Sequence, residues 1–400
     1  MDTLQAPIYL DWAATTPLSS EVLESMSNYL KPGKEGILFE GNANSLHSVG
    51  RKAFFALEEA RRTIARSFGL RRSDEIIFTS GATESDNAAI IGIVEAVWKN
   101  RLQQGKKDFV PHVIVSAIEH DAILNACKKL ESRGVKVSYA LPNRAGFIEP
   151  QMLEGLFTPE TVLVSIMAAN NEMGSIQPIK ELAEITHKHK AFFHTDMVQL
   201  LGKRNINLEE LKVDAASFSA HKICGPKGVG ALYLKARTPF DAYIVGGGQE
   251  NGLRSGTQNV CGAVGFACAL DNAQKNATCE ASRLAEMRDN LYKRLLSLPL
   301  VESPVDVLAQ PDKYLPSHVS ILVNSYESET LVLRLDQLGI CISGASACAS
   351  HSLEPSHVLS ALGVSRDKAL GSLRISMGCY TTQEDLDIFF DAFKKIIEEK

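Results

Sequence analysis

The sequence lacks the features that mark membrane, secreted and polyanion-binding proteins. No apolar run is long enough to cross a bilayer. The first residues contain neither a basic segment followed by an apolar one nor an arginine-rich amphipathic stretch, so neither secretion nor organelle import is indicated. A net charge of -5 gives no excess of basic side chains for nucleic acid or anionic lipid. We therefore expect a cytoplasmic protein that binds neither nucleic acid nor membrane.

Cysteine spacing shows no framework of disulfides or metal ligands. The 8 cysteines include no CxxC pair and no regular repeat, a pattern typical of reduced thiols in a cytosolic compartment. Free cysteine is among the most buried residue types. We expect Cys127, Cys261 and Cys268, which lie in apolar helical surroundings, to be small core residues.

Internal repeats and low-complexity tracts are also absent, and a chain of 400 residues exceeds what one hydrophobic core usually serves. Short apolar segments alternate with longer amphipathic ones, which favours a doubly wound parallel sheet whose ligands bind at the carboxyl ends of the strands. We expect strands at 75–79, 113–117, 162–167, 191–195, 215–219 and 229–234, and helices at 83–98, 121–132 and 179–189.

The alternation of short apolar and longer amphipathic segments ends at the polar, glycine-rich segment 246–256. One long helix is expected at 261–298, followed by a smaller unit of strands and helices. We place the boundary between a large and a small domain within this helix.

The segment 79–87, TSGATESDN, predicts an anion site. A strand ends here, a turn of small residues follows and a helix begins, so free backbone N–H groups and the Thr83 hydroxyl point toward one place. Taken alone, Thr83 and Asp86 equally fit a helix N-cap without a ligand.

Two further side chains are expected at strand ends. Asp196 ends the apolar run FFHTD, and Lys222 follows the run AASFS with Ser219 and His221 beside it. A carboxylate and a lysine amine are what a protonated pyridine nitrogen and an aldehyde carbon require. A lone pair of this kind is more often a helix cap and a surface lysine.

His120 also follows an expected strand, where its ring can stack on a flat heteroaromatic group and carry protons. A structural histidine is the alternative. Asn171, in the loop NNE at 170–172, lies within reach of the same ring, although loops rich in asparagine are common.

Taken together, these motifs resemble one family. The chain is similar to the NifS-like cysteine desulfurases, which are class-V aminotransferases of pyridoxal-phosphate fold type I, from about residue 8 to residue 395. The motifs that carry the resemblance are YLD at 9–11 with ATTP at 14–17, TSGATESDN at 79–87, EH at 119–120, NNE at 170–172, SAHK at 219–222, RSGT at 254–257 and SACASHSLEPSHVL at 346–359.

The resemblance implies a fold and a cofactor. The fold is α/β, with a mainly parallel seven-stranded sheet between helices in a large domain (16–272), and a smaller α+β domain (1–15 and 273–400) that carries a catalytic cysteine loop. The cofactor is pyridoxal 5'-phosphate, bound covalently by Lys222. Its other contacts would be Asp196 at the pyridine nitrogen, His120 on the ring, Asn171 and Gln199 at the phenolic oxygen, and Ala82, Thr83, Ser219 and His221 at the phosphate. Thr257 would reach the phosphate of a neighbouring subunit, which implies a homodimer.

The resemblance also assigns the reaction. Cys348 lies in a run of small residues that is able to move; it would attack the sulfur of L-cysteine, become a persulfide and pass the sulfur to an acceptor protein. His120 would carry the thiol proton, and Arg374 would grip the substrate carboxylate. Alanine is the other product. The acceptor serves iron-sulfur cluster assembly or another sulfur pathway.

Three other activities fit parts of the pattern. A selenocysteine lyase shares these motifs but needs no protein thiol, whereas an aminotransferase on the same fold needs no loop cysteine. A scaffold that has lost the cofactor is the non-enzymatic alternative.

Four positions depart from the family pattern: Trp12 in place of tyrosine, Gln249 and Asn251 in place of histidine and arginine, and Cys379 in place of arginine. None of them is expected to touch the chemistry directly. They leave the identity of the acceptor open and suit a specialised desulfurase.

Overall fold

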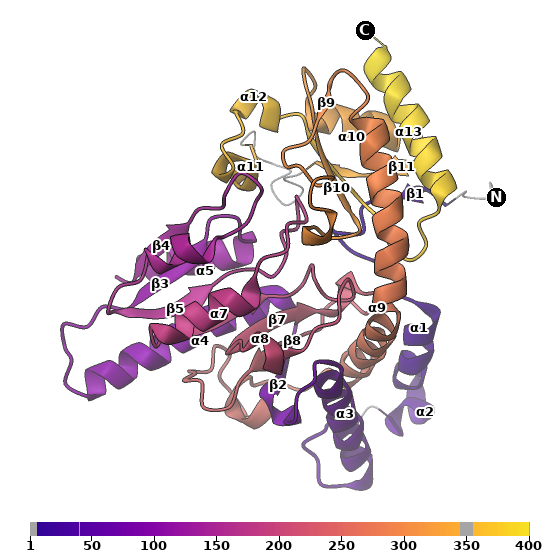
Figure 1. The fold of residues 1–400 in the computed structure, drawn as a ribbon. Helices are drawn as coiled ribbons and strands as arrows, with labels where there is room; N and C mark the ends of the chain where they lie inside the picture. Colours follow the sequence, from indigo (N-terminus) through magenta and orange to yellow (C-terminus); the bar gives the residue numbers. More distant parts are fainter. Residues whose placement is uncertain (1–5, 40, 345–354, 400) are drawn as a thin grey trace.

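The computed structural model describes residues 6–39, 41–344 and 355–399. Its largest element is a seven-stranded sheet flanked by helices, with a smaller unit built from both ends of the chain (Figure 1). In spatial order the strands are β2 (Ile76–Thr79), β8 (Gly230–Leu234), β7 (Ala215–Ser219), β6 (Phe192–Asp196), β5 (Thr161–Ser165), β3 (His112–Ser116) and β4 (Lys136–Ala140).

The sheet is mostly parallel, which confirms the expected α/β class. The neighbours β7, β6, β5, β3 and β4 are all paired in parallel. Strand β8 differs, because it pairs antiparallel with both β7 and β2; the expectation of a parallel strand at 229–234 was wrong in direction. The short turn after Lys222 leaves no room for the crossover that a parallel return requires.

Strand β4 was not expected from the sequence. It forms one edge of the sheet, and of its five residues only Ala140 is buried. Its apolar signal is therefore weak, since an edge strand with a solvated side needs few apolar residues.

Two helical layers cover the sheet. Helices α4 (Ala82–Gln103) and α5 (Asp121–Glu131) share a core with Val113 and Val115 of β3. Helices α3 (Ser48–Ser67), α7 (Ile179–Lys188) and α9 (Val260–Leu295) pack on the other face with Ile114. Alternate residues of a strand point to opposite faces, so β3 contributes to both cores.

The remaining α-helices are short or lie at the periphery. They are α1 (Ser20–Ser27), α2 (Gly33–Ile37), α6 (Pro150–Glu154), α8 (Leu208–Leu211), α10 (Ser328–Asp336), α11 (His357–Ala361), α12 (Arg366–Ala369) and α13 (Gln383–Glu398). Among the residues that the structure describes, no helix combines the length and apolar character needed to span a membrane.

The smaller unit has its own core. Strands β12 (Ser343–Gly344), β13 (Ser372–Ser376), β10 (His318–Val323) and β9 (Val301–Glu302) form an antiparallel sheet, and β1 (Ile8–Tyr9) pairs with β11 (Ile340–Cys341). Helix α9 joins the two units (Figure 1): its first residues pack in the core of the large sheet, and residues from Leu284 onward pack with β10 and β13. The proposed boundary at residue 272 falls between these two stretches.

The three cysteines expected in the core differ in burial. Cys127 is fully buried in α5, as expected. Cys261 and Cys268 lie on α9 and are only partly buried; Cys268 Sγ faces the carbonyl oxygen of Glu21 near the surface. The expectation of core residues was therefore wrong for these two, because α9 turns one side toward α1 and the solvent.

A buried ion pair holds the glycine-rich segment against the large domain. Arg61 of α3 donates two hydrogen bonds, of 2.6 and 2.8 Å, to the Glu250 carboxylate, which also accepts from the N–H of Phe78. The side chains of Arg61 and Glu250 are 8% and 3% exposed. Arg61 also pairs with Glu58 at 2.9 Å, whereas the buried Glu250 carboxylate depends on Arg61 for compensation of its charge.

Substitution of Arg61 tests this pair. In Arg61→Ala, Glu250 remains as an unpaired buried carboxylate, and we expect the free energy of unfolding to fall by roughly 3–5 kcal/mol. The neighbouring Arg62 makes only an exposed pair with Glu59, so Arg62→Ala should cost about 1 kcal/mol or less. Urea unfolding of both variants measures the difference, and equal losses would contradict the assignment.

Candidate active site

A cavity of about 480 Å³ lies at the carboxyl ends of β5, β6 and β7. Ligands of open α/β sheets bind at this edge, because the strand ends converge there. Nearly all the cofactor residues expected from the sequence line this one cavity: Ala82, Thr83, His120, Asn171, Asp196, Gln199, Ser219, His221 and Lys222.

One side of the cavity is suited to an anion. Gly81, with φ of 155°, is the N-cap of α4 and has no side chain to block the first N–H groups of that 22-residue helix. Ser219 and His221 line the same cavity. The pKa of His221 is lowered to about 4 by burial and by Lys222 and Lys227. His221 Nδ1 lies 3.0 Å from the Thr15 hydroxyl. When Nδ1 of the neutral ring accepts from this hydroxyl, the ring proton is on Nε2.

The turn before α4 is fixed by an ion pair. Glu84 accepts from the N–H of Ser80 at 2.8 Å and from Nε of Arg254 at 2.8 Å. These contacts lower the pKa of Glu84, although its burial alone acts in the opposite direction. The segment that carries Thr257 is thereby tied to the anion side of the cavity.

Lys222 ends the short 3-10 turn after β7. Its Nζ donates to the carbonyl oxygens of Ala13 and Ala14 at 2.6 and 2.8 Å. Thr16 donates its hydroxyl to the carbonyl of His221. Residues 13–16 therefore hold the lysine amine at the edge of the cavity.

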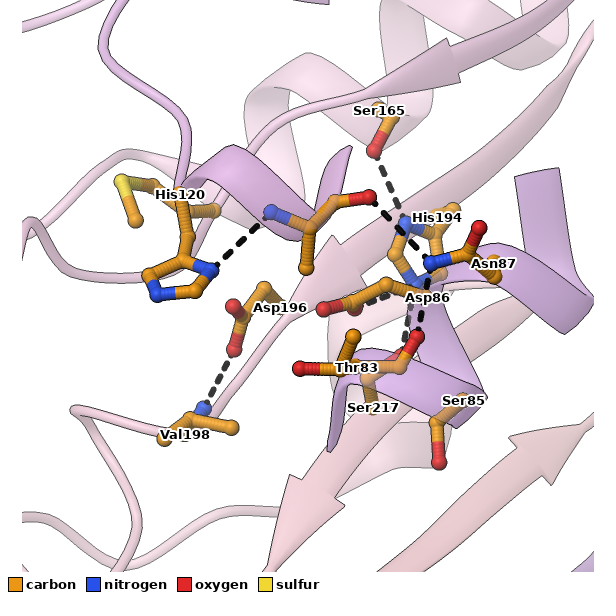
Figure 2. Close-up of polar contacts among 12 residues, drawn as sticks. Thr83, Ser85, Asp86, Asn87, His120, Ser165, His194, Asp196, Val198 and Ser217 are labelled. Carbon is orange, nitrogen blue, oxygen red and sulfur yellow. Dashed lines mark hydrogen bonds and ion pairs between the residues drawn. The ribbon is translucent and has the colours of Figure 1, made fainter. Parts of the chain in front are cut away.

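Asp196 lines the same cavity and belongs to a buried polar cluster (Figure 2). Its Oδ1 accepts from the N–H of Val198 at 2.8 Å. Asp86 of α4 is also buried, and burial and the charge of Asp196 raise its pKa well above the usual range. Burial also raises the pKa of Asp196. The charges of His120 and Lys222 lower the pKa of Asp196 but not that of Asp86, which favours Asp196 as the anion of the pair.

Behind these carboxyls, His194 is held by two serine hydroxyls (Figure 2). Ser165 lies 2.8 Å from Nδ1 and Ser217 lies 3.0 Å from Nε2, while Asp86 Oδ1 is 3.7 Å from Nε2. Complete burial lowers the pKa of His194 to about 3. This imidazole is therefore neutral and does not compensate the carboxylate charge. The charges of His120 and Lys222, on the wall of the same cavity, lower the pKa of Asp196 against the effect of its burial.

His120 is the N-cap of α5. Its Nδ1 accepts from the N–H of Ala122 at 3.1 Å, which leaves the proton of the neutral ring on Nε2. The cap fixes the ring at the cavity wall, as Figure 2 shows.

The predicted substrate arginine lies beside the cavity and is not one of its lining residues. Arg374 of β13 is 3% exposed, and its Nη2 donates to Asp11 at 2.9 Å. Its Nη1 donates to the carbonyl of Asn171, which does line the cavity. Gln199, also on the wall, donates to the carbonyl of Ala13.

Besides Arg374, two further predicted residues cannot be placed in this cavity. Thr257 is exposed and does not line it, and its role in another subunit stays a prediction. Cys348 lies in 345–354, outside the described residues.

Several residues of the site were missed in the sequence. Thr15, Glu84, Asp86, Met167 and Val198 line the cavity, as does Lys227. The sequence assigns Asp86 only to a helix cap. Its position two residues before the buried alanines of α4 nevertheless indicates that the side chain of Asp86 is buried. The contact of Asp86 with His194, 108 residues along the chain, had no signal in the sequence.

Two of the unusual residues support the segment before Thr257. Gln249 Oε1 accepts from the N–H of Gly256 at 2.9 Å. Asn251 takes a φ of 56°, a left-handed conformation that asparagine tolerates better than most residues.

The family model of the class-V aminotransferases matches residues 8–389, and the chain belongs to this family. Within it, the chain is 43% identical over 396 residues to the cysteine desulfurase IscS of Dictyoglomus turgidum, covering 99% of this chain and 96% of the relative. The resemblance inferred from the motifs is confirmed.

Solved structures agree. A structure named NifS-like protein is 37% identical, has a TM-score of 0.87 and is matched over 98% of this chain and 99% of its own. Another, described as SspA in complex with cysteine, is 32% identical with a TM-score of 0.77, over 94% of this chain and 99% of its own.

We expect the stability of the protein to depend on pH because of the buried Glu119, next to His120. Burial raises its pKa to about 8, so between about pH 4.5 and 8 the folded state binds a proton that the unfolded state has lost. Stability should therefore fall as pH rises through this window. In Glu119→Gln this fall should shrink by on the order of a few kcal/mol.

Urea unfolding at pH 5, 7 and 9 measures the effect. Glutamine keeps an oxygen to accept from the N–H of Met167, as Glu119 does at 2.7 Å. The control is Glu286→Gln, an exposed residue of α9, which should retain the wild-type slope. The interpretation fails if both variants follow the wild type.

Proposed function

We propose that this chain is a pyridoxal-phosphate-dependent cysteine desulfurase, which converts L-cysteine to L-alanine and leaves the sulfur as a persulfide on Cys348. The observation that carries the proposal is one cavity in which the amine of Lys222 and the carboxylate of Asp196 come from neighbouring strand ends. The similarity to cysteine desulfurases over nearly the whole chain supports it.

The residues present fit the cofactor. The helix N-terminus at Gly81, with Ser219 and His221, supplies donors for a phosphate. The buried Asp196 carboxylate is suited to a cation, such as a protonated pyridine nitrogen. Pyridoxal phosphate bound there supplies an electron sink for the α-carbon of an amino acid.

The chain's own groups then move protons. Lys222 Nζ would hold the cofactor and would be the base that takes the proton from the α-carbon of the substrate. His120 Nε2 faces the cavity and is suited to exchange a proton with the thiol of the substrate or of Cys348.

Cysteine as the substrate is supported by the carboxylate-binding arginine and by the SspA structure described with cysteine. Arg374 is held by Asp11 and by the carbonyl of Asn171, so its guanidinium is oriented before the substrate arrives. Its Nε has no hydrogen-bond partner among the described residues, which leaves one donor for a ligand.

We further propose a cytoplasmic homodimer that hands sulfur to an acceptor protein for iron-sulfur clusters or another sulfur-containing cofactor. The exposed Thr257 supports the dimer. So do large apolar side chains on the surface of the single chain, since Leu46, Phe55 and Val245 are 90%, 61% and 81% exposed.

The first test separates the lysine from the cysteine. Lys222→Ala should lose covalent cofactor, measured by borohydride trapping and mass spectrometry, and at least roughly 10²- to 10⁴-fold of its activity on either substrate. Cys348→Ser should keep the trapped cofactor, lose alanine production from cysteine and retain it from selenocysteine.

Each alternative gives a distinct result. Equal retention of both substrates by Cys348→Ser favours a selenocysteine lyase. Amino-group exchange with keto acids, without sulfide, favours an aminotransferase. Wild-type protein that never binds pyridoxal phosphate favours a scaffold.

The second test concerns Arg374. In Arg374→Lys the oriented planar guanidinium and its Nε donor are lost, and we expect KM for cysteine to rise roughly 10- to 100-fold with a smaller change in kcat. Arg366→Lys, at an exposed position of α12, is the matched control. An unchanged KM in Arg374→Lys would remove the residue from the substrate site.

A further inference from the structure

A second cavity, of about 380 Å³, shares Lys222 with the first. Its wall includes Trp12, Lys203, Cys224 and Cys379, none of which lines the first cavity. Trp12 and Cys379 are two of the unusual residues of this chain. They were expected to lie away from the chemistry, but both lie in a space bounded by the same lysine.

Two thiols meet in this cavity. The Sγ atoms of Cys224 and Cys379 are 3.9 Å apart although the residues are separated by 155 positions in the chain. Cys224 belongs to the large domain, two residues after Lys222. Cys379 lies on the exposed turn between β13 and α13 of the small unit. Any covalent bond between them therefore joins the two units.

The backbone fixes Cys224 in place. Its φ of 60° lies in the left-handed region, which a cysteine seldom adopts. Its N–H donates to Thr16 Oγ1 at 2.7 Å, which holds this conformation. Cys379 follows Gly378, where any side chain would collide with Trp12, so the turn that presents its thiol is also constrained.

The surroundings make the two thiols unequal. The contact with Cys379, the Thr16 hydroxyl and the amine of Lys203 lower the pKa of Cys224 to about 7, against the effects of burial and Glu21. The same contact, burial and Glu280 raise the pKa of Cys379. Of the two thiols, Cys224 therefore ionises more readily than Cys379. This asymmetry is found in reactive dithiols.

Two simpler interpretations do not account for the pair. Within 6–39, 41–344 and 355–399, no group of three or more His, Cys, Asp or Glu side chains is able to hold a metal ion. Core packing does not explain it either, because Cys379 is exposed and Cys224 only partly buried.

We propose that Cys224 and Cys379 form a redox-active dithiol that hydroperoxides oxidise to a disulfide. The Cys224 thiolate attacks one oxygen of hydrogen peroxide, the O–O bond breaks, and hydroxide leaves with a sulfenic acid on Cys224. The Cys379 thiol then attacks this sulfur, water leaves and the S–S bond forms. Two electrons pass from the thiols to the peroxide.

Bond formation requires only a small movement. A disulfide has an S–S length of about 2 Å, so the two sulfurs, 3.9 Å apart, must approach by roughly 2 Å. The product links the segment that carries Lys222 to the end of β13. This inference rests on the geometry of the two thiols and is independent of the proposed activity.

Peptide mapping tests the inference on the full-length protein. After treatment with hydrogen peroxide and alkylation of the remaining thiols, trypsin should release residues 223–227 joined to residues 375–394. Dithiothreitol should separate the two peptides. The cross-link closes a long loop, so it should also raise the midpoint of thermal unfolding by several degrees.

Variants make the test specific. Cys379→Ser leaves the constrained backbone at Cys224 unchanged; it should abolish the linked peptide and the thermal shift and leave a sulfenic acid on Cys224 that dimedone traps. Cys279→Ser, at an exposed thiol of α9, should behave as the wild type. If both peptides are recovered separately alkylated while the peptide containing Cys348 is oxidised, the proposal is wrong.

Discussion

The short strap of residues 10–16 is the constraint on which the arrangement of the site depends. It pairs with the small unit through the N–H of Ser376 and the carbonyl of Leu10, and it meets the large domain where Ala13 and Ala14 accept from Lys222. Thr16 bonds both His221 and Cys224. A few backbone and hydroxyl groups thus fix the positions of Lys222, His221 and Cys224 relative to the small unit.

Much of this site was predictable because parallel strands end at one edge. Asp196 and Lys222 each follow an apolar run, and this position alone made them candidates. The lining of one cavity by both follows from β6 and β7 being neighbours. Similarly, the helix N-terminus at Gly81 was evident from small residues after a strand. These features are read from short segments of sequence, and such predictions hold in the folded protein when the sheet is regular.

What escaped prediction depends on contacts between distant residues. The buried position of Asp86 near His194 and Ser217 is an example. The meeting of Cys224 with Cys379 is of the same kind, since nothing near either cysteine in the sequence refers to the other. Strand β4 was not predicted for another reason. It is an edge strand with a side exposed to solvent, so its residues show little apolar pattern.

Helix α9 runs without a break from the core of the large sheet to that of the small unit. A continuous helix resists bending, because its hydrogen bonds are shared along its whole length. The two units are therefore joined by a stiff rod and not by a hinge. Because the strap of residues 10–16 also crosses between the units, a shift of one unit against the other would reach the amine of Lys222 directly through Ala13 and Ala14.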